Sequence, residues 1–154
     1  MTRTPPWDRL KELAEKKRDA HAQRLGALTR ERDEAKQRLA MLVTYRSEYQ
    51  SRLAEASTQG IDLTRLRNYQ AFLAQLERAI AKQADIVAQA ERSVDGAKAQ
   101  WTSERQRVES FNALDERHGN GVARSEQRRA QKLADEWATR NVAHARPTTP
   151  DTDH

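Results

Sequence analysis

The 154-residue sequence contains no cysteine, only five glycines and four prolines, and 5% aromatic residues. Without cysteine there is no disulfide framework, no thiol nucleophile and no thiolate metal site. The scarcity of glycine and proline argues against a fold of many strands and turns. No run approaches the roughly 18 apolar residues of a membrane span, and the N-terminus has no apolar signal-peptide core. We therefore expect a soluble, cytoplasmic protein.

Charged residues, in contrast, are abundant: they make up 33% of the chain, against 36% hydrophobic residues. Ala, Glu, Lys, Leu, Arg and Gln dominate, which is typical of long surface helices. A helical hairpin needs only one apolar stripe per helix, whereas a compact core needs many more large apolar side chains. The net charge of +5 would permit a nucleic-acid partner. However, acidic residues alternate with the basic ones, and no aromatic residues interleave with the basic clusters, so nucleic-acid binding is not expected.

Turn and capping signals divide the chain into two helices. Thr4 is a capping residue and Pro5 suits the first helical position. Gly60 is suited to end the first helix and Asp62 to cap the second, and the glycines around Asn120 indicate a kink or break. The expected boundaries are a single domain over 1–140 with a helix at about 5–57, a turn at about 58–62, a helix at about 63–140 with a break near 119–121, and a disordered tail over 141–154.

Apolar residues recur at alternating steps of three and four along both predicted helices, which is the spacing of a coiled coil. The stripe of the first helix comprises Leu25, Leu28, Arg32, Ala35, Leu39, Leu42, Arg46, Tyr49, Leu53 and Ala56. It continues upstream, with one extra residue as a phase drift, through Trp7, Leu10, Ala14, Lys17 and His21. The stripe of the second helix comprises Leu66, Tyr69, Leu73, Leu76, Ile80, Gln83, Val87, Ala90, Val94, Ala97, Trp101, Glu104, Val108 and Phe111.

The short link around Gly60 requires the two stripes to run antiparallel. Residues equidistant from the link then pair, and the two residue numbers of each pair add to 118 or 119. The expected pairs include Leu53 with Leu66, Tyr49 with Tyr69, Leu42 with Leu76, Leu39 with Ile80, Leu25 with Val94, Leu10 with Val108, and Trp7 with Phe111. Lys17 would lie near Trp101, with its aliphatic stem on the ring. The prediction is an all-α fold: a long antiparallel two-helix coiled-coil hairpin whose second helix overhangs the first.

No catalytic motif is present. The sequence has no glycine-rich phosphate loop and no nucleophile elbow, and none of its four histidines has metal-ligand spacing with another. A two-helix hairpin also offers no enclosed pocket from which water could be excluded. We expect no enzymatic activity, no cofactor and no metal.

Two rows of residues beside the predicted turn suggest a protein-binding surface. The first is Arg38, Leu42, Tyr45 and Tyr49; the second is Phe72, Leu76, Ala79 and Gln83. Tyr45 and Phe72 lie outside the stripes, so we expect both to be partly exposed. An apolar strip on a charged coiled coil indicates a docking site. The alternative is that these side chains merely wrap over a thin core.

The chain resembles the FliJ family, the small coiled-coil components of the flagellar type III export apparatus. The resemblance rests on MLVTYRSEYQSRL, GIDLTRLRNYQAFLAQLERAI and LDERHGNGVARSEQRRAQKLADEWATR, and it covers nearly all of residues 7–140. It implies a stalk-like hairpin that binds the export ATPase FliI and promotes assembly of its ring. It also implies binding to the export gate protein FlhA and to export chaperones, in the cytoplasm at the inner face of the cell membrane at the flagellar base.

The same resemblance implies the residues that bind the gate. They are Leu42, Tyr45, Tyr49, Phe72, Leu76 and Ala79, with Arg38 and Gln83 at row ends where the family varies. The terminal end of the hairpin would enter the ATPase ring. Two alternatives stay open at this point: a stalk protein of a virulence secretion injectisome, and a structural coiled-coil oligomer with no export role.

Overall fold

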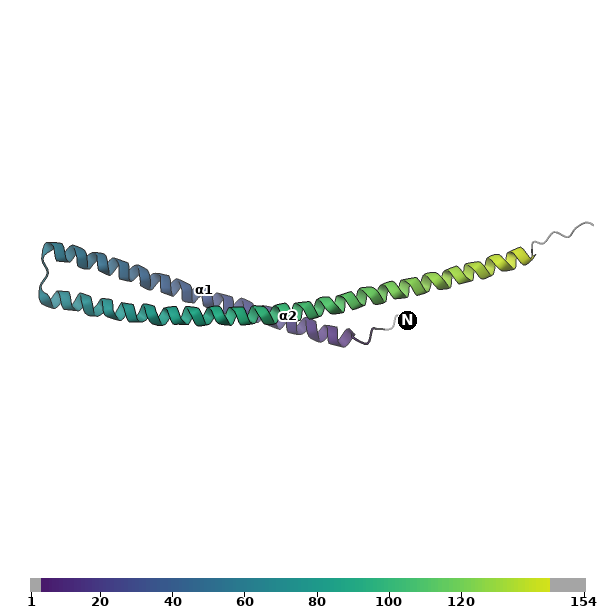
Figure 1. The fold of residues 1–154 in the computed structure, drawn as a ribbon, viewed down its shortest axis with the longest axis horizontal. Coiled ribbons are helices and arrows are strands. Elements are labelled where there is room, and N and C mark those ends of the chain that lie inside the picture. The colour runs from purple at the N-terminus through teal and green to yellow at the C-terminus, as the bar shows by residue number, and fades with distance from the viewer. Residues whose placement is uncertain (1–3, 145–154) are drawn as a thin grey trace, which may run out of the picture. The chain divides into compact units, whose positions relative to one another are not determined.

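The computed structural model describes residues 4–144, which form two helices, α1 (Asp8–Gln59) and α2 (Leu63–His144) (Figure 1). No strand occurs within this described range. The predicted all-α class is confirmed. The described chain divides into two compact units, residues 10–108 and residues 4–9 with 109–144, and each is described by itself below.

In the unit of residues 10–108, α1 and the first part of α2 form an antiparallel hairpin (Figure 1). The seam between them is narrow and apolar. Two helices bury only the stripe that they share, so few side chains are fully covered. The buried residues all belong to the predicted stripes: Ala14, Ala35, Leu76, Val87, Val94, Ala97 and Val108. The heptad pattern thus predicted the core of the hairpin correctly.

Two contacts across the seam confirm the predicted register. The side-chain amide of Gln83 donates a hydrogen bond to the main-chain oxygen of Ala35 at 3.0 Å. The rings of Tyr49 and Tyr69 meet edge to face with centroids 6.2 Å apart. In both cases the two residue numbers add to 118, the value that the pairing rule predicts.

Ion pairs flank the seam on one side. Lys36 Nζ lies 3.1 Å from a carboxylate oxygen of Glu91, and Arg46 Nη1 lies 3.3 Å from one of Glu77. Their side chains are between about a third and a half exposed, so each pair contributes little to stability, of order 0–1 kcal/mol. Both pairs are nevertheless compatible with the antiparallel register.

The phase of the stripe at the start of α1 differs from the prediction. Leu10 is 57% exposed and Lys17 is also exposed, whereas Ala14 is only 2% exposed and Lys11 and Arg18 are half-buried. The steps of three and four therefore continue through Lys11, Ala14 and Arg18 without an extra residue. Long basic side chains lie along such a seam with their aliphatic stems and keep their charged ends in water. The predicted Leu10–Val108 pair and the predicted phase drift are wrong.

The cation that lies over the Trp101 ring is the guanidinium of Arg105, 5.0 Å from the ring centroid, whereas the predicted Lys17 is exposed. Arg105 follows Trp101 by one helical turn on α2, a spacing that brings two side chains of one helix together. The cation therefore comes from the same helix as the ring.

The turn matches its sequence signals. Gly60 has φ +89°, a left-handed conformation in which an L side chain would be strained, and α1 ends one residue earlier. The Asp62 carboxylate accepts a hydrogen bond from the main-chain N–H of Arg65 at 2.8 Å, so it caps α2 as predicted.

The start of α1 is later than the prediction. Pro5 lies before the helix, and its carbonyl accepts a hydrogen bond from the N–H of Asp8 at 3.1 Å. A residue that precedes a proline is disfavoured in the helical region, and Pro5 precedes Pro6. The helix consequently begins at Asp8.

In the unit that contains residues 4–9 and 109–144, Trp7 anchors the start of the chain to α2. Its indole N–H donates a hydrogen bond to Asp115 at 2.7 Å, and its ring meets the His118 ring edge to face at 5.6 Å. These partners lie one and two helical turns beyond the predicted partner Phe111, which is half-buried.

Helix α2 is continuous through Gly119 and Gly121 and ends at His144. Each glycine costs a helix only about 1 kcal/mol relative to alanine, and the predicted break at 119–121 does not occur. Residues 141–144, assigned to the tail by the sequence, are helical, and the rest of that predicted tail lies outside the described residues.

Candidate functional site

The hairpin presents aromatic side chains on one side of its seam, close to the turn. Tyr45 is 48% exposed and Phe72 is 38% exposed, which confirms that both lie partly outside the core. The ring of Tyr49, from the seam, packs against Phe72 with centroids 4.2 Å apart. Tyr49 of the seam thus packs against one side of the Phe72 ring, and part of that ring remains exposed to solvent.

The other residues of the two predicted rows differ in how far they are buried. Leu76 is 8% exposed and belongs to the core, and Gln83 is turned inward to Ala35. Leu42 and Ala79 are half-buried, and Arg38 is exposed. The structure therefore packs Tyr49 against Phe72 and uses Leu76 and Gln83 mainly to hold the hairpin together.

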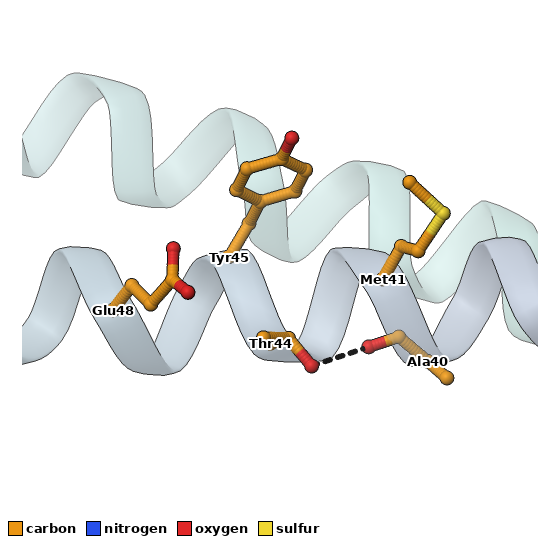
Figure 2. Close-up of a pocket in the computed structure, with 5 residues that line it drawn as sticks. All are labelled: Ala40, Met41, Thr44, Tyr45 and Glu48. Carbon is orange, nitrogen blue, oxygen red and sulfur yellow. Dashed lines mark hydrogen bonds between the residues drawn. The ribbon is translucent and has the colours of Figure 1, made fainter.

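A shallow cavity of about 510 Å³ adjoins Tyr45 on α1. Figure 2 shows Met41 and Tyr45 pointing to the same side of the helix, whereas the Thr44 hydroxyl donates a hydrogen bond to the Ala40 main-chain oxygen at 2.9 Å. Met41 is 58% exposed, and an exposed methionine is a flexible apolar contact that adapts to a partner. Sequence reasoning missed Met41, although its position four residues before Tyr45 places it on the same face.

We define the tip surface as Met41, Tyr45 and Tyr49 of α1 with Phe72 and Ala79 of α2. A second cavity, of about 310 Å³, lies at the end of this surface nearest the turn. It is lined by Tyr49, Arg52, Arg65, Asn68, Tyr69 and Phe72 and is called the arginine cavity below. Its polar residues, Arg52, Arg65 and Asn68, were not among the residues that the sequence singled out.

Another exposed apolar surface lies on the last part of α2. Every residue from 119 to 144 is exposed, including Val122, Leu133, Trp137 and Val142. Trp137 is 69% exposed, and a tryptophan so accessible on a charged helix is a candidate contact for another protein. Its ring and the Leu133 side chain, one turn apart, share a face of the helix.

The described residues hold neither a metal site nor a membrane-spanning helix. Within 4–144, no group of three His, Asp or Glu side chains is placed to hold a metal ion. Neither helix in that range combines the length and apolar character required to cross a lipid bilayer.

Comparison with known proteins decides the family. A family model described as "Flagellar FliJ protein" matches residues 5–147. The chain belongs to the FliJ family. It is 36% identical over 131 residues to the Flagellar FliJ protein of Escherichia coli (strain K12), an alignment that covers 85% of this chain and 89% of the relative. The Flagellar FliJ protein of Salmonella typhi shows the same identity over the same length, with the same coverage.

The FliJ match includes every candidate surface described above. Its range, 5–147, contains the tip surface, the arginine cavity and the exposed end of α2. The resemblance found in the sequence is thereby confirmed as family membership.

Proposed function

We propose that this FliJ-family chain is a non-enzymatic component of the bacterial flagellar type III export apparatus, acting as a stalk-like coiled coil. Family membership over residues 5–147 and the helical hairpin support the proposal. In this role the chain binds the export ATPase FliI and promotes assembly of its ring, links the ring to the export gate protein FlhA, and interacts with export chaperones. It works in the cytoplasm at the inner face of the cell membrane.

The observation that carries the docking role is the exposure of Tyr45 and Phe72 beside a seam that does not need them. The seam buries Leu76 one helical turn after Phe72, so truncating the exposed rings leaves the core intact. Exposed aromatic residues over a rigid support are the residues that most often dominate protein–protein binding energy. We assign the gate contact to this tip surface, with the half-buried Leu42 and the buried Leu76 as its support and Arg38 at its edge.

The ATPase contact is assigned to the exposed part of α2. Leu133 and Trp137 have no intramolecular cover in the described chain, and the surrounding helix is rich in charged residues. An amphipathic helix of this kind binds through an apolar stripe in a groove of its partner. The two assigned contacts belong to different compact units, so separate variants can test them.

A two-arm pull-down tests the assignment with purified FliI and the purified linker segment of FlhA. The tip variant carries Tyr45→Ala and Phe72→Ala, and the end variant carries Leu133→Ala and Trp137→Ala. We expect the tip variant to lose the gate linker and keep the ATPase, and the end variant to do the reverse. Val43→Ala, an exposed apolar truncation on the other flank of the seam, is the control. Retention of both partners by both variants would refute the assignment.

A structural oligomer without an export role is the competing function. It predicts a stable multimer in sedimentation at micromolar concentration and no binding to either export component. A monomer that captures FliI and the FlhA linker would exclude it.

A further inference from the structure

The arginine cavity has a charge pattern that the apolar docking surface does not explain. Its lining residues include Arg52, Arg65 and Asn68 but no acidic residue. The Arg52 guanidinium lies over the Tyr49 ring, 5.4 Å from the centroid. The cavity is thus lined by two basic residues and by the three aromatic residues Tyr49, Tyr69 and Phe72.

These two cations differ from others along the same hairpin. Lys36 and Arg46 each have a carboxylate partner on α2 within 3.3 Å. Within residues 4–144, no carboxylate is paired with the guanidinium of Arg52 or Arg65. The nearby Asp62 accepts a hydrogen bond from the main-chain N–H of Arg65 and is not a lining residue of the cavity. No carboxylate therefore lines the cavity.

We infer that the arginine cavity recognises an acidic residue next to an apolar one in a linear segment of the protein that docks on the tip surface. An arginine fork binds a carboxylate through two parallel hydrogen bonds, which gives direction as well as affinity. The floor of Tyr49, Tyr69 and Phe72 would receive the neighbouring apolar side chain. The cavity is shallow and measures about 310 Å³, at the lower end of ligand-site volumes, which is room for a short peptide motif.

This inference rests on the proposed docking function and refines it. The tip surface supplies apolar contact area, and the arginine cavity, which shares Tyr49 and Phe72 with it, fixes the position of the partner segment along the hairpin. A misplaced segment would leave both cations without a counter-charge. The arginines therefore set specificity and orientation.

Calorimetric titration of the full chain with the purified FlhA linker tests the inference. The test variant is Arg52→Gln with Arg65→Gln. The matched control, Arg67→Gln with Arg78→Gln, removes the same two charges from exposed positions on α2 outside the cavity. We expect the test variant to bind about tenfold more weakly and with a flatter salt dependence, and the control to bind within about twofold of the unaltered chain. Arg65→Gln alone serves if loss of the Arg52–Tyr49 contact lowers helicity.

A carboxylate-to-amide scan of the linker completes the test. Neutralising one particular carboxyl group of the linker should weaken binding to the unaltered chain. The same change should have no effect on binding to the test variant, because the arginines that the carboxyl group contacts are already absent there. If the test variant binds as tightly as the control while Tyr45→Ala with Phe72→Ala weakens binding, the inference falls and the docking function stands. If neither pair weakens binding, both fall. Loss of binding to vesicles of anionic phospholipid, with linker affinity unchanged, would assign the arginines to a membrane and also refute the inference.

Discussion

Gln83 on α2 donates a hydrogen bond to the main-chain oxygen of Ala35 on α1 at 3.0 Å, across a seam that is otherwise mostly apolar. The two residue numbers add to 118, so the bond forms in the alignment that the pairing rule predicts. Polar residues in a coiled-coil seam commonly contribute to register. Gln83 therefore acts on the hairpin itself, although the sequence placed it at the edge of the docking surface.

Replacing Gln83 with alanine should lower the free energy of unfolding by about 1 kcal/mol, the usual net contribution of one hydrogen bond. Affinity for the gate linker should not change, because the side chain points into the seam. Thermal denaturation and linker titration measure the two effects. The exposed Gln89→Ala is the control and should change stability by less than about 0.5 kcal/mol. A loss of linker affinity with unchanged stability would instead return Gln83 to the docking surface.

The position of the apolar stripe at the start of α1 predicts stability effects of different size for substitutions at Leu10 and Ala14. Leu10→Ser should change stability by less than about 0.5 kcal/mol because the side chain is largely exposed. Ala14→Leu should cost about 1–3 kcal/mol because the buried alanine has no room for a larger side chain. Denaturant unfolding followed by circular dichroism compares them. The reverse ranking would restore the phase drift that the sequence suggested.

Among the candidate gate-binding residues, substitution of Leu76 should affect the stability of the hairpin, whereas substitution of Tyr45 should affect binding. Leu76→Ala removes a buried side chain from the seam and should destabilise the hairpin by about 2–5 kcal/mol. Any weakening of partner binding by this change should disappear at low temperature, where the hairpin is refolded. Tyr45→Ala should show the opposite combination, a small stability change and weak binding at all temperatures. Persistent weak binding of a folded Leu76→Ala variant would make Leu76 a direct contact.

The heptad spacing predicted the hairpin and its register because a two-helix seam is nearly one-dimensional. Leu76, Val87 and Val94 were assigned to the seam from spacing alone, and all three are buried. The spacing failed at Leu10, where an apolar residue adjoins the true stripe position, Lys11. Hydrophobicity alone predicts the leucine as the seam residue. The lysine occupies the seam position instead, because its aliphatic stem can pack there although its end is charged.

The exposed aromatic residues of the site followed from the same reasoning, since Tyr45 and Phe72 are one position off the stripe. The arginine cavity did not follow. Arg52 and Arg65 are two among many basic residues in the sequence, and only the structure shows that both border one aromatic floor without a carboxylate. Lack of a counter-charge is a property of three-dimensional neighbours, so spacing along one helix could not reveal it.

Affinity of the Tyr45→Ala, Phe72→Ala variant for the FlhA linker is the most direct test of the tip as a docking surface. Circular dichroism and sedimentation should match those of the unaltered chain, since neither ring fills the seam. The dissociation constant should rise by about tenfold or more, corresponding to about 1.4 kcal/mol, and cells carrying the variant should swim poorly at normal protein levels. Loss of helicity would make the two rings core residues and contradict the account. Unchanged affinity and motility in a folded variant would contradict it equally.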